Sequence, residues 1–260
     1  MYSSYVDIDK EVSVNNSTAT EILSVKIDVL DHDGVISRIS GFLAGNRLHQ
    51  ITPVNPEFIM AAQQDAELRN IANNSDLNVP DGVGLQVAAK ILHIEIGQRI
   101  TGVDLTLQLA KLGSADGHSL FLLGAGEGVA AKAADRLKME HQQLRIAGTY
   151  SGSPREEGIV ERINDSGADI LLVAFGVPKQ EKFIYENRDK LNVKVAMCVG
   201  GTFDFLAGII PRAPLWMRSL GIEWLYRLIR QPQRINRIIT ATIRFPVAVV
   251  LNRLSGAGRK

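Results

Sequence analysis

The sequence is poor in the residues that build disulfides and metal sites. It contains one cysteine, Cys198, and five histidines that lack metal-ligand spacing. A single thiol excludes an internal disulfide framework and a four-cysteine zinc site, and it favours a reducing, cytoplasmic environment. We therefore expect no disulfide and no bound metal.

Segments that would direct the chain into a membrane are also lacking. Residues 1–16 are polar and acidic, without the basic and apolar regions of a secretory signal. The longest apolar runs, 170–177 and 245–251, fall short of the roughly 18 residues that a spanning helix needs. We expect that the protein does not cross a membrane.

The charge is balanced overall but unevenly distributed. The 260 residues contain 29 Lys and Arg against 28 Asp and Glu. Residues 212–260 hold ten of the basic residues and one acid, Glu223, so this segment carries +9 and residues 1–211 carry −8. Four arginines are spaced three, four and three apart and share one helical face, although Pro232 must kink or restart the helix: Arg227, Arg230, Arg234 and Arg237.

The same segment contains the interfacial aromatics Trp216, Trp224 and Tyr226. Its pattern predicts a basic, amphipathic, membrane-associating appendage at 212–260, attracted to anionic lipid by ~1 kcal/mol per well-placed Arg or Lys. The alternative is a solvated face packed on the domain by its apolar side. Nucleic acid is not expected, because no base-reading motif accompanies the arginines. Contact of the apolar positions with a second subunit, and hence a homo-oligomer, stays open.

Before this segment, apolar runs alternate with helical patterns. We expect a strand or hairpin at 22–30 and a strand at 49–54, then further strands at 77–79, 119–123, 144–147, 169–175 and 193–199. Helices are expected at 31–45, 56–73, 85–92, 127–141, 154–166 and 178–190. Continuously apolar strands that alternate with helices predict an α/β fold with a Rossmann-like parallel sheet flanked by helices.

These patterns also divide the chain. Residues 1–20 lack periodicity and are expected to be a flexible extension. Residues 21–211 form the α/β domain, with a smaller N-terminal α/β part at about 21–117 and the Rossmann-like part at about 118–211. The basic helical appendage follows.

Ligands of parallel sheets bind at the carboxyl ends of the strands, which directs attention to the loops there. Gly124 and Gly126 belong to a glycine-rich turn, 124–128, that follows a strand and opens a helix. Such a turn holds a diphosphate on backbone N–H groups, or serves only as a tight turn. A full dinucleotide fingerprint is missing, because Val129 stands where the third glycine would be.

Three other loops carry polar groups at strand ends. Asp81, between Pro80 and Gly82, is either a general base or a helix N-cap. Lys179 and Gln180 follow an apolar strand and read as substrate contacts. Gly201 and Asp204, in the loop 200–205, indicate a further contact region or a turn with a cap.

Two Asp-x-Asp triplets have a spacing that can ligate a divalent metal. The first, 7–9, lies in the N-terminal extension. The second, 31–33, precedes a helix and is read as an N-cap.

Taken together, these blocks resemble the WecG/TagA/CpsF family of bacterial glycosyltransferases. The matching segments, in order, are TPVNPE at 52–57, PDGVG at 80–84, RITGVDL at 99–105, LLGA at 122–125, GVPKQEK at 176–182, GGTFD at 200–204, RAP at 212–214 and EWLYRL at 223–228. The resemblance spans about residues 22–240.

The resemblance implies an inverting, metal-independent and cofactor-free transfer of a sugar, typically of the N-acetylmannosamine type, from a UDP-sugar. The acceptor it implies is a polyprenyl-diphosphate-linked saccharide at the inner face of the plasma membrane, in cell-surface polysaccharide or teichoic acid synthesis. It implies Asp81 as the base, a pocket lined by Thr52, Asn55, Arg99 and Gln180, and Asp204 near the nucleotide.

The basic appendage would hold such an enzyme at the bilayer. Arg212 and the arginines of the 227–237 face would meet lipid or substrate phosphates. Two other functions are kept as alternatives: a nicotinamide-dependent oxidoreductase, and a non-catalytic, membrane-docked protein that binds a nucleotide sugar.

Overall fold

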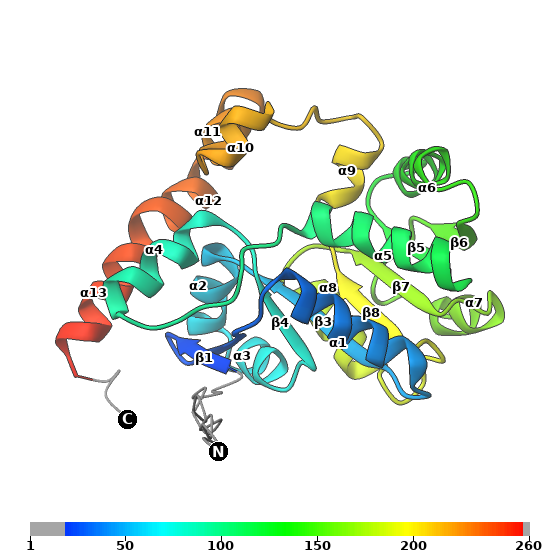
Figure 1. Ribbon diagram of the computed structural model, residues 1–260, viewed down its shortest axis with the longest axis horizontal. Helices are drawn as coiled ribbons and strands as arrows, with labels where there is room; N and C mark the ends of the chain where they lie inside the picture. Colours follow the sequence, from blue (N-terminus) through cyan, green and yellow to red (C-terminus); the bar gives the residue numbers. More distant parts are fainter. Residues whose placement is uncertain (1–18, 257–260) are drawn as a thin grey trace, which may run out of the picture.

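The computed structural model describes residues 19–256 (Figure 1). Its centre is a six-stranded, all-parallel sheet in the order β4-β3-β8-β7-β5-β6. The strands are β3 (His49–Val54), β4 (Leu77–Pro80), β5 (Ser119–Gly124), β6 (Arg145–Tyr150), β7 (Ile170–Ala174) and β8 (Val195–Cys198). The two halves expected at 21–117 and 118–211 therefore contribute to one sheet.

Helices cover both faces of this sheet. One face packs against α1 (His32–Ala44), α5 (Gly102–Asp116) and α6 (Val129–Glu140), and the other against α7 (Ile159–Asp165) and α8 (Lys179–Glu186). Because both faces are covered, the strands are apolar without alternation, and β5 and β7 are buried along their whole length. The predicted α/β class with a parallel, helix-flanked sheet is confirmed.

A smaller apolar cluster lies beside the β4 edge. It joins the hairpin β1 (Ala19–Ile22) and β2 (Val25–Asp28) to α2 (Pro56–Gln64), α3 (Ala66–Asn73) and α4 (Val83–Leu92). The prediction of a single helix at 56–73 is wrong, because the helix is interrupted at Asp65. The Asp65 side chain accepts the Leu68 N–H and so caps the start of a new helix. Helix α5 was not expected.

Two predictions concern the N-terminal residues. Asp31 caps α1 by accepting the Gly34 N–H at 2.8 Å, as its cap reading predicted. Most of the expected extension, 1–18, and the triplet at 7–9 lie outside the described residues, whereas residues 19 and 20 belong to β1.

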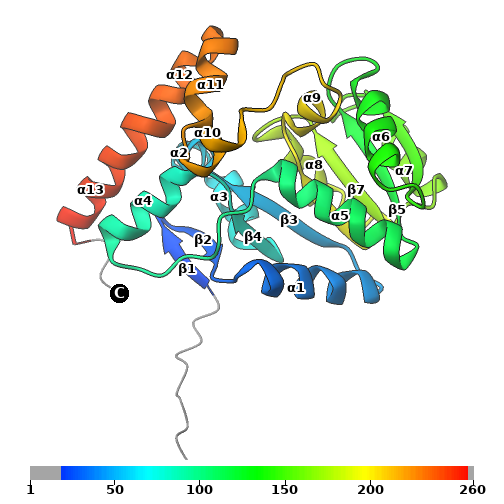
Figure 2. The ribbon, with the colours of Figure 1, turned by 45° about the horizontal axis from the view of Figure 1, so that its top comes forward.

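The C-terminal segment forms a helical arm over the β4 side of the domain (Figure 2). After α9 (Thr202–Leu206), an extended stretch leads to α10 (Leu215–Ser219) and α11 (Glu223–Arg230). A 3₁₀ turn at Pro232–Arg234 restarts the helix, which continues through α12 (Ile235–Ile239), a π-helical turn (Thr240–Arg244) and α13 (Phe245–Leu254). The interruption predicted at Pro232 is present.

This arm corrects one expectation. The stretch Pro232–Leu254, 23 residues, is long and apolar enough to cross a membrane by length and composition alone. The sequence reading missed it because arginines divide the apolar residues into short runs. Phe245 and Val249 are fully buried in the cluster with α2 and α4, so the helix is packed along the domain in this structure.

Candidate active site

Asp81 lies directly after β4, at the carboxyl edge of the sheet. Its backbone N–H donates to the Val54 carbonyl, which ties it to the end of β3. Its Oδ2 accepts the Gly102 N–H at 3.4 Å, at the first residue of α5. Asp81 does not cap α4, whose N-cap position is Gly82 and has no side-chain cap. The carboxylate is thus aimed at the positive end of a fifteen-residue helix.

The loop after β8 reaches the same place. A Cβ added to Gly102 would lie 3.3 Å from Thr202 Oγ1 and 3.9 Å from Asp81 Oδ2, so only glycine allows this approach without displacing the Thr202 hydroxyl. Asp81, Gly102 and Thr202 therefore form one small polar cluster where three segments distant in sequence converge.

The surroundings shift the proton affinity of Asp81. Burial raises the pKa of its carboxyl from 3.8 to about 6, and the charge of Glu223 adds to this rise. The Gly102 N–H and the guanidinium groups of Arg227 and Arg99 act in the opposite direction. At neutral pH the group is mainly ionised, and it binds a proton more readily than an exposed aspartate.

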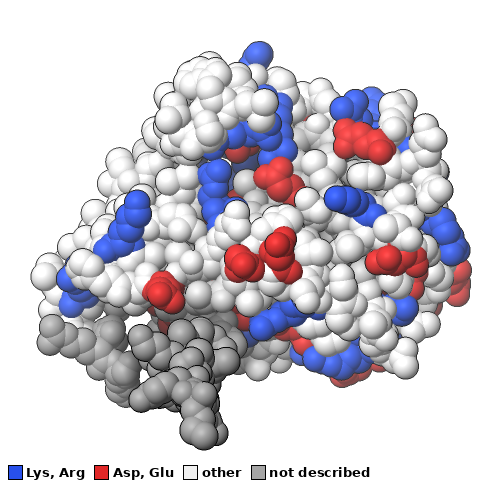
Figure 3. Space-filling view, viewed as in Figure 1, with Lys and Arg blue, Asp and Glu red and all other residues white. Residues whose placement is uncertain are grey.

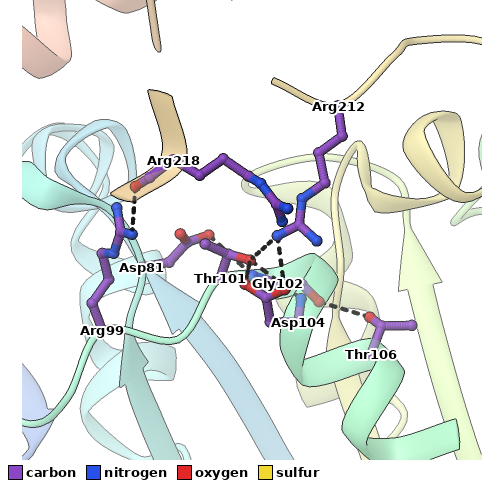
Figure 4. A network of polar contacts seen from close by, with 8 residues as sticks. All are labelled: Asp81, Arg99, Thr101, Gly102, Asp104, Thr106, Arg212 and Arg218. Atoms are coloured by element: carbon purple, nitrogen blue, oxygen red, sulfur yellow. Dashed lines mark hydrogen bonds and ion pairs between the residues drawn. The ribbon is translucent and has the colours of Figure 1, made fainter. Parts of the chain in front are cut away.

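The appendage is fastened above Asp81 by arginines (Figure 4). Arg99 donates from Nη2 to the backbone carbonyl of Arg218 at 3.2 Å. Arg212 donates from Nη2 to Asp104 Oδ1 at 2.8 Å and to Thr101 Oγ1 at 3.3 Å. These contacts join the segment before α5 and the first turn of α5 to both ends of the 212–218 stretch.

The arginines of the predicted basic face separate into inward and outward ones. Arg227 stacks over the Phe205 ring at 4.7 Å and approaches Gly201, where an added Cβ would lie 3.6 Å from its Nη2 and 3.9 Å from Arg234 Nη2. Arg237 pairs with Glu57 of α2. Arg230 is exposed and lies over its neighbour Tyr226. Asp204 Oδ2 would lie 3.6 Å from the Cβ added to Gly201, so it belongs to this region.

Three guanidinium donors of the appendage have no acceptor. Among the described residues, the Nε–H groups of Arg212, Arg218 and Arg227 are buried without a hydrogen-bond partner. A buried donor without an acceptor costs about 1–3 kcal/mol, more for a charged group. In Figure 3, basic side chains gather in the hollow beneath the nearly uncharged surface of α10 and α11, with acidic groups beside them.

Other predicted site residues are placed differently. Thr52 is fully buried in β3, and its hydroxyl pairs with Ser75 Oγ at 2.8 Å. Asn55 Oδ1 caps α2 by accepting the Phe58 N–H at 2.9 Å. Gln180 is buried, and its side-chain amide bonds within the protein.

The glycine-rich turn 124–128 lies after β5, at the same edge of the sheet. A Cβ on Gly124 would come within 2.9 Å of the Ala174 backbone, so close packing on β7 requires this glycine. An added Cβ on Gly126 would lie 3.3 Å from Val129 Cγ2. Gly124 therefore has a structural reason to be glycine, whereas the contact at Gly126 is with a side-chain methyl group alone.

The contact region expected at 200–205 includes Thr202, whereas the sequence analysis missed Arg218 and Glu223 as members of the site. Glu223 did carry a signal, as the one acid in the basic segment. Arg218 lies outside the three-four-three spacing, and Thr202 faces Asp81 only through the folding of α9. Asp81 lines neither of two open hollows of about 440 and 550 Å³, although Phe205 and Arg212 line the second.

The parallel sheet, the half-buried carboxylate at its carboxyl edge and the arginines above it define an α/β enzyme suited to a transfer reaction of anionic substrates. The comparisons with known proteins make this specific. The chain belongs to the glycosyl transferase WecG/TagA/CpsF family, whose model matches residues 20–259. It is a glycosyltransferase, and the family resemblance is confirmed.

Two relatives have the same name, N-acetylglucosaminyldiphosphoundecaprenol N-acetyl-beta-D-mannosaminyltransferase. The protein of Bacillus subtilis (strain 168) is 32% identical over 191 residues, which cover 73% of this chain and 75% of the relative. That of Bacillus spizizenii (strain ATCC 23059 / NRRL B-14472 / W23) is 30% identical over 200 residues, covering 76% and 78%.

Proposed function

We propose that this enzyme transfers N-acetylmannosamine, with inversion, from a UDP-sugar to a polyprenyl-diphosphate-linked saccharide. The names of its relatives support the sugar and the lipid-linked acceptor. The observation that carries the proposal is the Asp81 carboxylate at the carboxyl edge of the sheet, which lies beneath arginines whose Nε–H groups are buried without a partner. The product serves cell-surface polysaccharide or teichoic acid synthesis.

Inversion needs one base and a stabilised leaving group. Asp81 accepts the proton of the acceptor hydroxyl while the oxygen of that hydroxyl attacks the anomeric carbon of the donor sugar. The bond from that carbon to the phosphate oxygen breaks on the opposite face, and UDP departs with the electron pair. A pKa of about 6 suits this role, because the group is ionised at neutral pH and still attracts the proton.

The arginines supply charge for the diphosphate. The unpartnered Nε–H groups of Arg212, Arg218 and Arg227 are donors that phosphate oxygens would satisfy. Such fixed cations stabilise the negative charge that grows on departing UDP. In this proposal they replace a metal ion, so turnover persists in excess EDTA. Asn55, Asp204, Arg99 and the turn 124–128 complete the proposed binding region.

We further propose that the appendage docks on the inner face of the plasma membrane. Its arginines mostly face the domain, whereas its large apolar side chains face outward. Those more than half exposed are Leu215, Trp216, Leu220, Ile229, Ile243, Val247, Leu251 and Leu254. Transfer of such apolar side chains from water into lipid is favourable by ~25 cal/mol per Å² of surface removed from water.

In this arrangement the helix 232–254 lies on the membrane and does not span it. Phe245 and Val249 hold it against α2 and α4, Arg237 pairs with Glu57, and Arg253 donates to the Ile91 carbonyl. Crossing the bilayer would break these contacts and bury the helix arginines in lipid. The site then opens toward a lipid-linked acceptor.

The test is UDP release from a panel of UDP-sugars with a short lipid-diphosphate-saccharide acceptor. Turnover is expected with UDP-N-acetylmannosamine and severely reduced in Asp81→Asn. Undiminished turnover of that variant would remove Asp81 from the mechanism. Binding of a UDP-sugar without transfer to any acceptor would favour the non-catalytic alternative. Point substitutions test the role of the appendage better than truncation at residue 211 does, because truncation would remove Phe245 and expose the apolar cluster it packs against.

A further inference from the structure

Gln180 occupies an unusual position at the start of α8, between the ends of β7 and β8. Its side chain is 4% exposed. Its Oε1 accepts two backbone N–H groups, those of Gly176 and Gly200, each at 3.1 Å. Its Nε2 donates to Glu181 Oε1 at 2.8 Å. Both polar atoms of the amide are therefore engaged inside the protein.

The orientation of this amide is fixed by its partners. Two N–H donors face the same atom, so that atom must be the oxygen, and the amino group must face Glu181. Glu181 is 1% exposed, and burial raises the pKa of its carboxyl to about 7. Its Oε1 accepts the Gln180 hydrogen bond whether or not the other oxygen carries a proton.

The two bridged turns lead to the active site. Gly176 and Gly200 adopt left-handed backbone conformations, with φ of +77° and +51°. The residue after Gly200 approaches the guanidinium of Arg227, and the next, Thr202, lies beside Gly102 and Asp81. A shift of the Gly200 turn would therefore move these groups relative to the base.

We propose that Gln180 is a positioning residue. It joins the turns after β7 and β8 and so fixes the distance between these two turns, which bind the UDP-sugar. This differs from direct contact between its amide and the sugar nucleotide. The bridge itself rests on the observed hydrogen bonds, whereas its effect on donor binding rests on the proposed function.

The first experiment measures amide hydrogen exchange in the ligand-free, full-length protein. In the wild type, the N–H groups of Gly176 and Gly200 are expected to be protected, although they lie in turns. Gln180→Met, of similar size but without hydrogen-bonding groups, should raise exchange at both, roughly tenfold. The matched control is Gln63→Met, which removes two side-chain hydrogen bonds, one to the Leu23 carbonyl between β1 and β2 and one to the Ile59 carbonyl in α2, and leaves these turns unchanged.

Kinetics then separate positioning from contact. Gln180→Met should raise the KM for the UDP-sugar by roughly tenfold and change kcat less, with Gln63→Met at the wild-type value. A raised KM with unchanged exchange at the two glycines would overturn the proposal in favour of direct contact. If Gln180→Met does not fold, fast exchange of both amides in the wild type would still refute the bridge. Absence of turnover in the wild type would refute the proposed function and leave the exchange test intact.

Discussion

The partly buried carboxylate of Asp81, whose pKa is raised by desolvation, predicts that the enzyme gives up stability for activity. A rise in pKa from 3.8 in the unfolded chain to about 6 in the folded protein means that ionisation opposes folding. Well below pH 3.8 the carboxyl is protonated in both states and contributes nothing. Well above pH 6 it is ionised in both, and the folded state is destabilised by up to about 3 kcal/mol.

Asp81→Asn removes this charge and retains an oxygen that accepts the Gly102 N–H. We expect the variant to be more stable than the wild type at pH 8, by up to about 3 kcal/mol, with the gain disappearing as the pH falls toward 4. Its turnover should fall by about 10²–10⁴, as for loss of a general base. In the wild type, kcat/KM should rise with pH and level off above about pH 6.

Guanidinium unfolding followed by circular dichroism at pH 4.5, 6 and 8 measures the stability, and UDP release measures turnover. Asp135→Asn, at an exposed position of α6, is the matched control and should show no pH-dependent gain. An Asp81→Asn protein that is less stable than the wild type at pH 8, or equally changed at all pH values, would refute the assigned burial.

Further measurements address the appendage. Glu223→Gln removes a charge that raises the pKa of Asp81, so the rising limb of kcat/KM against pH should move to lower pH. An unchanged pH profile would show that the charge of Glu223 does not act on Asp81. Ile229→Glu should weaken cosedimentation with anionic vesicles by roughly tenfold or more, because an outward apolar side chain is lost, whereas Met139→Glu, exposed on α6, should not. Alkaline carbonate should release vesicle-bound protein, and retention would show that 232–254 spans the bilayer. Turnover should survive excess EDTA, and its loss would point to a metal ion.

The predicted strands agree with the structure because a strand covered on both faces must be apolar throughout. Local pattern and observed structure diverge at the longest helix that the sequence predicts. At 56–73 the helical periodicity continues through Asp65, yet its side chain caps a new helix there.

The appendage shows the same division. Its charge excess and aromatic residues predicted a distinct basic segment, which the structure contains. The sequence could not predict whether the arginines point toward the domain or toward a membrane. Their helical spacing shows that they share one face of the helix, but it does not show what that face contacts. In the structure Arg227 and Arg234 face the site, and the exposed apolar side chains face outward.

The α/β class, the parallel sheet, the family and Asp81 as the leading candidate for the base could all be predicted from the sequence. These depend on local periodicity and on residue blocks that are contiguous in the chain. The approach of Thr202, Arg218 and Glu223 to Asp81, and the bridge that Gln180 makes between two turns, became apparent from the folded chain alone. Such contacts link segments that are distant in the chain, and their distances and desolvation depend on how the whole sheet and the helical arm pack.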